Sequence, residues 1–289
     1  MDVGSNTIKL LVAGATDKGK LSVLHEARNS TRIGTGIGSA QPELTEEHMQ
    51  AGVAAIESLL NEAAAHNPGI IRMVATGAVR DASNGNDFAK RVLSETGHAL
   101  AILSGEEEAA GIAAGLVTDP SLADKSDFLA CDLGGGSLEL ILVENRSVRA
   151  KVSLPLGAIR LTERFINDPE ARPDEMELHD LDQHVNETLS ESSFPSSVEV
   201  DCVVATGGAF VAARTILAER EGIPFQERSL ITQCEIAEIF SEIIQLTLPQ
   251  RIECFPALPP SRADVMPAAL ACMLSLLDYL QANKVRHSL

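Results

Sequence analysis

Residues 128–139 read Phe-Leu-Ala-Cys-Asp-Leu-Gly-Gly-Gly-Ser-Leu-Glu, and this stretch decides the fold. Its apolar start predicts a buried strand that ends near Asp132. The glycines that follow, at 134–136, predict a turn in which backbone N–H groups converge on an anion, because glycine has no Cβ to obstruct the approach. Ser137 adds a hydroxyl donor. The alternative interpretation is a plain tight turn with a capping Asp132 and a solvent-facing Glu139.

The carboxylates of Asp132 and Glu139 flank this predicted anion site. Carboxylates beside a bound anion are useful only when a cation lies between them, as Mg²⁺ does with phosphates. The stretch therefore predicts a phosphate site that uses Mg²⁺ or another divalent cation.

A shorter version of the pattern opens the chain, as Asp2-Val-Gly-Ser-Asn-Thr. This turn is a weaker signal alone, because short Asp-x-Gly turns are common. Asn6 offers an amide donor and Lys9 adds positive charge. The two Asp-x-Gly turns lie roughly 130 residues apart, each at the start of a β-rich half. An internal duplication is indicated, with two similar lobes that face a cleft.

Strands alternate with helices along the rest of the chain, which is typical of a mostly parallel α/β sheet. Asp17-Lys-Gly-Lys is a hairpin signal, and the polar, turn-rich residues 118–126 are the predicted boundary. The lobes are therefore expected over residues 1–119 and 120–289. The expected helices span residues 45–66, 87–96, 104–116, 158–166, 173–192, 210–221, 232–247 and 262–282. The apolar positions of the last helix indicate either core packing or a homodimer face.

Three successive carboxylates follow Ser104-Gly, at Glu106, Glu107 and Glu108. A capping box from Ser104 to Glu107 and the helix dipole explain the first two without any function. Glu108 instead flanks the apolar stripe of the predicted helix. Since this helix starts at the carboxyl end of a strand, Glu108 is well placed to reach a cleft; a simple helix-terminus role stays open.

Two further motifs follow strand ends. Arg80 has the guanidinium geometry that forks onto phosphoryl oxygens, although an ion pair with Asp81 or Asp87 accounts for it equally well. Thr206-Gly-Gly, between a strand and a helix, suits a phosphate or nucleotide cradle, or simply a close strand–helix turn.

Composition excludes several classes of function. The formal net charge of −18 repels nucleic acid and anionic membranes, and the absence of Trp with a single Tyr leaves little for base stacking. No run reaches the ~18 apolar residues of a membrane span, and a signal peptide is not apparent. The five scattered cysteines predict reduced thiols in a cytoplasmic protein, and the histidines lack zinc-site spacing.

Taken in order, the motifs resemble the exopolyphosphatase/guanosine pentaphosphate phosphohydrolase (Ppx/GppA) family, within the sugar kinase, heat-shock protein and actin superfamily. The matching stretches begin at Asp2, Ala75, Ser104, Asp132, Leu156, Ala205 and Arg262. The resemblance covers nearly the whole chain. The chain starts one residue before Asp2, so the first strand is expected to be truncated, and the chain resembles the short two-domain form, which ends before the extra helical domain of longer members. Ala209 stands where Thr is commoner.

The resemblance implies two actin-like lobes with duplicated ribonuclease-H-like sheets and an active site in the cleft. In the family pattern Glu108 activates water, while Glu139 assists and holds Mg²⁺ with Asp132, and Arg80 contacts the phosphoryl groups. The residues expected to bind phosphate are Gly4, Ser5, Asn6, Thr7, Gly134, Gly135, Gly136, Ser137, Gly207 and Gly208.

The implied reaction is release of the terminal phosphate of polyphosphate. Guanosine pentaphosphate is the alternative substrate, and the short form with few aromatics favours polyphosphate slightly. A catalytically weak alarmone or polyphosphate sensor is a further alternative, but Glu108, Glu139 and Arg80 together favour an enzyme. A kinase of the superfamily fits less well, because it requires a complete adenosine loop and a catalytic Asp.

Overall fold

A computed structural model describes residues 1–15, 21–195, 200 and 202–288. The chain divides into two compact units, Met1–Ser104 and Gly105–Leu289. The expected boundary was at 119/120, which placed helix α4 (Gly105–Thr118) in the first lobe, whereas α4 belongs to the second unit. α4 groups with the second unit because its apolar face packs into that unit's core. The core residues include Ala109, Ala113, Leu116, Phe128, Ile141 and Val204.

The first unit contains a five-stranded sheet in the order β3-β2-β1-β4-β5. Its strands are β1 (Asp2–Val3), β2 (Ile8–Ala15), β3 (Leu21–Asn29), β4 (Met73–Ala75) and β5 (Leu100–Ile102). β1, β2 and β3 pair antiparallel, whereas β1, β4 and β5 pair parallel. The predicted hairpin signal at residues 17–20 lies outside the described residues.

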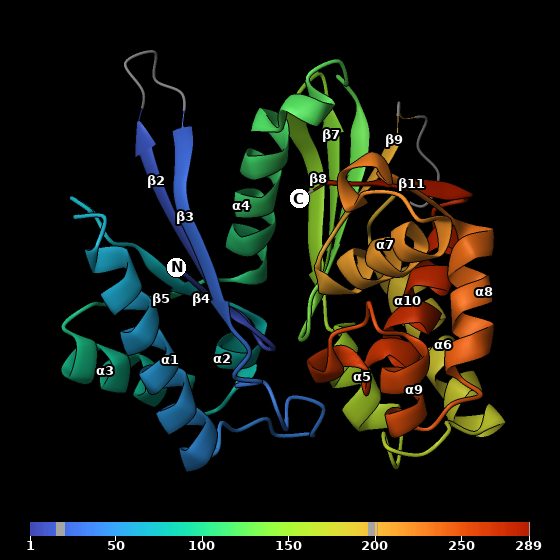
Figure 1. Ribbon diagram of the computed structural model, residues 1–289, viewed down its shortest axis with the longest axis horizontal. Helices are drawn as coiled ribbons and strands as arrows, with labels where there is room; N and C mark the ends of the chain where they lie inside the picture. Colours follow the sequence, from blue (N-terminus) through green and yellow to red (C-terminus); the bar gives the residue numbers. More distant parts are fainter. Residues whose placement is uncertain (16–20, 196–199, 201, 289) are drawn as a thin grey trace. The chain divides into compact units, whose positions relative to one another are not determined.

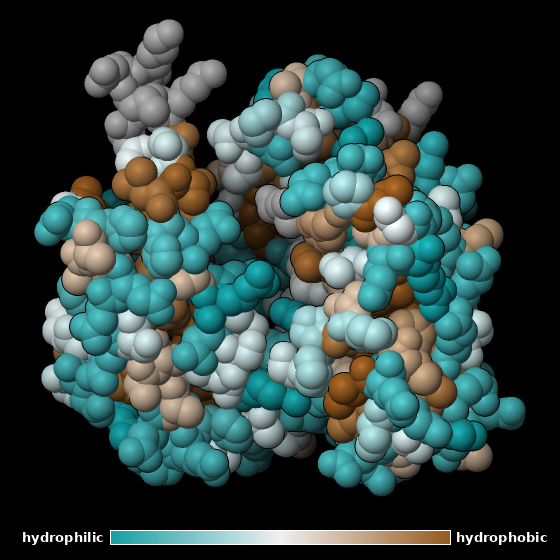
Figure 2. Space-filling view, viewed as in Figure 1, coloured by the Kyte–Doolittle hydropathy of each residue, from teal (hydrophilic) through white to brown (hydrophobic). Residues whose placement is uncertain are grey.

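Three helices accompany this sheet: α1 (Glu46–Ala64), α2 (Gly77–Asp81) and α3 (Gly85–Thr96). α1 packs on β2 and β3, and α3 packs on β5 and α1 (Figure 1). Thr45 caps α1, since its side chain accepts a hydrogen bond from His48 N. Hydrophobic residues gather at the free end of the β2–β3 hairpin (Figure 2). The exposed apolar residues of these strands are Leu11, Leu21, Val23 and Leu24.

The second unit repeats this sheet arrangement. Its strands are β6 (Phe128–Leu133), β7 (Leu138–Glu144), β8 (Ser147–Leu154), β9 (Cys202–Thr206), β10 (Leu230–Thr232) and β11 (Lys284–His287). In space they run β8-β7-β6-β9-β11-β10. β6, β7 and β8 pair antiparallel, and β6, β9 and β11 pair parallel, as in the first sheet. β10 adds one antiparallel edge strand. The shared order confirms the predicted duplication of ribonuclease-H-like cores.

The described residues of the second unit form six further α-helices. They are α5 (Ala158–Phe165), α6 (Glu175–Glu191), α7 (Gly208–Glu221), α8 (Gln233–Ile243), α9 (Leu248–Cys254) and α10 (Met266–Tyr279). α10 lies among α5, α6, α7 and α8 (Figure 1), and its Leu270, Met273 and Leu277 are fully buried. Of the two interpretations of this apolar helix, core packing is the one the structure shows. Within the described residues, no helix is both long and apolar enough to cross a bilayer.

Candidate functional site

The turn between β6 and β7 presents its N–H groups away from helix α5. The carbonyl oxygens of Gly134 and Gly135 accept from Ala158 N and Ile159 N, each at 2.9 Å. Arg160 Nε donates to Gly136 O at 2.8 Å. In a trans peptide the N–H points opposite to the C=O. The N–H groups of residues 135–137 therefore point away from α5, as an anion-binding turn requires.

The turn between β9 and α7 packs against the end of β6, at Asp132 and Leu133. Gly207 has φ +99°, and a Cβ there would lie 2.4 Å from Leu133 O and 2.6 Å from Asp132 Oδ1. This close approach excludes larger residues. The structure thus brings the predicted Gly207–Gly208 turn beside Asp132 and places the N-terminus of α7, which favours anions, in the same part of the second unit.

The guanidinium group of Arg262 lies over Gly208. A Cβ on Gly208 would fall 1.9 Å from Arg262 Nη1 and 2.2 Å from Cζ, so only glycine leaves room for this arrangement. Sequence reasoning matched Arg262 to the family pattern but assigned it no role. Its contact joins a residue next to α10 to a turn more than fifty positions earlier in the chain, which no local pattern reveals.

Glu139 is buried, with 1% of its surface exposed; the alternative of a solvent-facing Glu139 is wrong. On β7 it lies opposite Asp132 of β6 and opposite Ser153 of β8. Burial, together with the nearby charges of Glu108 and Asp132, raises the pKa of Glu139 to about 8, while hydrogen bonds from Ser153 and Ser137 oppose the rise. The second unit therefore brings Glu108 and Asp132 within electrostatic range of Glu139.

The first unit holds the N-terminal loop in a closed network. Gly4 N donates to Thr7 O at 3.3 Å, and the loop carbonyls of Ser5 and Asn6 accept from Gly34 N and Arg32 N. The Ser5, Asn6 and Thr7 side chains are buried. Within the described residues, Asn6 Oδ1 has no hydrogen-bond partner. Hydrogen bonds thus hold the loop in place, and Asn6 Oδ1 is a buried acceptor without a partner among the described residues.

Asp2 and Arg80 belong to this loop's surroundings. Burial raises the pKa of Asp2, and its buried Oδ1 has no hydrogen-bond partner among the described residues. Ser5 Oγ accepts from Ala78 N at 3.2 Å, which ties the loop to the short helix that carries Arg80. Arg80 Nε pairs with Asp81 Oδ1 at 3.3 Å. The expected ion pair with Asp81 is therefore present, in the same unit as the loop.

The residues around Asp132 fit a divalent cation that keeps part of its water. The donors present are carboxylate oxygens, which Mg²⁺ prefers, and the charge that accumulates around buried Glu139 calls for a counter-charge. Within the described residues, no group of three or more His, Cys, Asp or Glu forms a metal cage. Mg²⁺ is commonly held by one or two carboxylates together with water and substrate phosphates, so a full cage is not needed.

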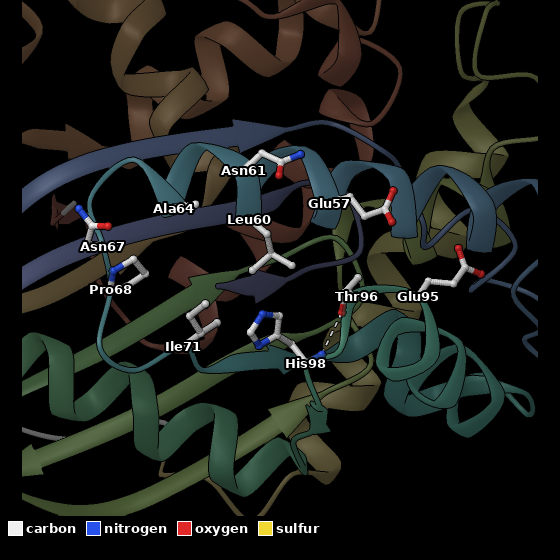
Figure 3. Close-up of a pocket in the computed structure, with 10 residues that line it drawn as sticks. All are labelled: Glu57, Leu60, Asn61, Ala64, Asn67, Pro68, Ile71, Glu95, Thr96 and His98. Atoms are coloured by element: carbon white, nitrogen blue, oxygen red, sulfur yellow. Dashed lines mark hydrogen bonds between the residues drawn. The ribbon is translucent and has the colours of Figure 1, made fainter.

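A cavity of about 660 Å³ in the first unit lies between the ends of α1 and α3. Its lining mixes apolar side chains such as Leu60 and Ile71 with Glu57, Glu95 and His98 (Figure 3). None of its ten lining residues belongs to the N-terminal loop or is Arg80. This cavity is separate from the predicted phosphate residues.

Sequence reasoning assigned no role to three residues that shape the β6–β7 turn and its carboxylates. Ser153 hydrogen-bonds to Glu139, and Gly157 and Arg160 support the glycine turn. Gly157 and Arg160 lie in a stretch that matched the family pattern, so that match was the available signal. Ser153 shows only the alternation of an ordinary strand, which carries no functional signal.

Comparison with known proteins places the chain in a family. A model described as the Ppx/GppA phosphatase family matches residues 11–289. A guanosine-5'-triphosphate,3'-diphosphate pyrophosphatase of Vibrio vulnificus is 26% identical over 98% of this chain and 55% of its own length. The chain thus spans about half the length of that curated relative.

Solved structures agree with this placement. The crystal structure of an Aquifex aeolicus Ppx/GppA family member superposes with a TM-score of 0.78 at 25% identity, covering 99% of this chain and 91% of that one. An exopolyphosphatase from Cytophaga hutchinsonii gives a TM-score of 0.86 at 22% identity, covering 99% and 92%; this second likeness concerns the fold. With its two similar sheets and a family match over residues 11–289, the chain belongs to the Ppx/GppA phosphatase family.

Proposed function

We propose that the chain hydrolyses the terminal phosphoanhydride bond of inorganic polyphosphate and releases phosphate. The observation that carries this proposal is the position of buried Glu139, next to Glu108 and at the end of a glycine turn whose N–H groups point away from α5. Phosphoryl transfer depends mainly on positioning and charge neutralisation, and this arrangement supplies both.

Each predicted residue receives a role in this reaction. Glu108 accepts the proton of the attacking water, and Glu139 supports it. Asp132 and Glu139 hold Mg²⁺, which would neutralise phosphoryl charge when bound. The N–H groups of residues 135–137 and the Ser137 hydroxyl bind phosphoryl oxygens. In the first unit, the Gly4–Thr7 loop and Arg80 are proposed to bind phosphoryl groups as well.

Two observations support an inorganic substrate. The Arg262 guanidinium lies over Gly208, and a cation at this turn attracts a substrate made of phosphoryl groups. The chain also has no Trp and only one Tyr for stacking on a base. Guanosine pentaphosphate is the second candidate, because the curated Vibrio vulnificus relative is named as a pyrophosphatase of that nucleotide.

The test measures phosphate release from long-chain polyphosphate and from guanosine pentaphosphate, with Mg²⁺ and with EDTA. Glu108→Ala is expected to lose at least ~100-fold in kcat, the scale of a lost general base. Glu175→Ala, which removes an exposed first-turn carboxylate of α6, is the matched control and is expected to retain full activity. Near-normal turnover by Glu108→Ala would refute its role. No release from either substrate by the unmodified chain would favour the sensor.

We place the protein in the cytoplasm, which its five free cysteines support. A homodimer is also proposed. Since α10 is buried within its own unit, the dimer would use another face. Light scattering coupled to size-exclusion chromatography distinguishes monomer from dimer.

A further inference from the structure

Ser153 contacts both elements that carry the glutamates. Its hydroxyl donates to Glu139 Oε1 at 2.6 Å, and the receiving carboxylate is buried beside other carboxylates. A hydrogen bond to a charged group is stronger than one between neutral groups. The bond fixes one Glu139 oxygen, and Ser137 donates a further hydrogen bond to the same carboxylate.

The same side chain sets how closely α4 approaches the sheet. A Cβ on Gly105, the first residue of α4, would lie 2.5 Å from Ser153 Cβ and 2.9 Å from its Oγ. Two positions earlier on the same face of β8, Lys151 Nζ donates to Glu106 O at 2.9 Å. The first turn of α4, which carries Glu108, is therefore held against Lys151 and Ser153.

We propose that Ser153 is a positioning residue that fixes Glu139 relative to Glu108. Its hydroxyl orients Glu139, and its Cβ meets the glycine that starts the Glu108 helix. This inference rests on the proposed function, in which Glu108 and Glu139 act on the same phosphoanhydride. Small errors in the placement of catalytic groups cost large factors in rate, so both contacts of Ser153 affect the chemical step more than substrate binding.

Two single variants separate the contacts. Ser153→Ala removes the hydroxyl and keeps Cβ, whereas Gly105→Ala keeps the hydroxyl and forces α4 away from Ser153. We expect each to lower kcat, Ser153→Ala by about tenfold, the scale of one hydrogen bond to a charged group, with KM changed less than about twofold. Gly105→Ala combined with Ser153→Gly removes the clash between the two Cβ atoms and is expected to be more active than Gly105→Ala alone. Ser147→Ala, at the exposed start of β8, is the control.

A double-mutant cycle with Glu139→Ala, which leaves Ser153 no acceptor at position 139, tests whether Ser153 acts through Glu139. Ser153→Ala is expected to change kcat little in the Glu139→Ala background. The effects on Tm are expected to be non-additive by about 2–4 °C, the shift that ~1 kcal/mol of coupling gives a protein of this size.

Three results would contradict the positioning role of Ser153. Unchanged kcat in Ser153→Ala, or an equal loss in both backgrounds, overturns the inference while phosphate release by the unmodified chain upholds the proposed function. If the unmodified chain releases phosphate from neither substrate, the proposed function fails. In that case the Tm values of the single and double variants are the remaining test. Additive effects on Tm would reject the link between Ser153 and Glu139.

Discussion

Gly157 packs directly against the backbone of Gly135: a Cβ at position 157 would lie 2.4 Å from both the carbonyl carbon and the oxygen of Gly135. The next residue, Ala158, begins helix α5, whose first N–H groups bind the carbonyls of the glycine turn. Because the obstacle is backbone, no side-chain rotation relieves it. Gly157→Ala is therefore expected to displace the turn and to lower kcat/KM for phosphate release by at least ~100-fold.

The matched control is Gly115→Ala. Gly115 lies on α4, and a Cβ there meets nothing within 4 Å, so activity should be retained. The thermal midpoint should rise by about 1–4 °C, because alanine is the better helix residue by about 0.5–1 kcal/mol. Gly157→Ala with normal kinetics would show that the turn does not need its contact with α5.

The sequence predicted those parts of the site that depend on local patterns. The glycine turn after β6, the Asp-x-Gly repeat and the duplicated sheets follow from residue types within a few positions of each other. Contacts between distant segments were not predictable, such as Arg262 on Gly208 or Ser153 on Glu139. Short elements also escaped prediction. Helices α2 and α9 and strands β10 and β11 have three to seven residues each, too few for a hydrophobic period to show.

Glu139→Gln is expected to stabilise the metal-free protein although it impairs catalysis. Burial beside the charges of Glu108 and Asp132 raises the pKa of Glu139 to about 8. Near pH 7 the folded chain must therefore hold a proton that the unfolded chain does not, and glutamine removes this cost. Glutamine still offers an oxygen to Ser153. We expect Tm in EDTA to rise by about 2–4 °C, the equivalent of ~1 kcal/mol. Scanning calorimetry measures this, and a lower Tm would contradict it.

Arg251 is expected to be essential for folding rather than for chemistry. Its side chain is fully buried, and its guanidinium donates only to backbone. The acceptors are the carbonyl oxygens of Pro169, Ala171, Ile243 and Ala263. Arg251→Met leaves these oxygens unpaired and should cost at least about 3 kcal/mol in the free energy of unfolding. Urea denaturation measures the loss; Arg149→Met, at an exposed arginine, should change it by less than ~0.5 kcal/mol.

His287 is expected to make the protein acid-sensitive. Burial and the charge of Arg214 lower the pKa of His287 from 6.5 to about 4, and Arg214 Nη1 contacts its Nδ1 at 2.9 Å. The folded state thus binds the proton less well than the unfolded state. The contribution of neutral His287 to the free energy of unfolding is therefore complete above pH ~6.5. It is lost as the pH falls toward 4, by about 2–3 kcal/mol in total.

His287→Gln should remove that share of the acid sensitivity in urea unfolding measured from pH 7 to pH 4. His179→Gln, at an exposed histidine of α6, should leave the slope unchanged. Equal slopes for His287→Gln and the unmodified chain would show that His287 is protonated normally in the folded state.

Gly208→Ala tests whether the Arg262 guanidinium contacts substrate. The obstacle to a Cβ on Gly208 is the guanidinium end of Arg262, a flexible group that can swing aside at little cost to the fold. The variant should therefore keep its Tm within ~2 °C. Its KM for polyphosphate should rise by about tenfold, the value of one charge-assisted contact. Gly207→Ala is the informative contrast, because φ +99° and the Leu133 carbonyl at 2.4 Å make its cost a structural one. If Gly208→Ala binds polyphosphate normally while Gly207→Ala lowers Tm, the Arg262 guanidinium shapes the turn without contacting substrate.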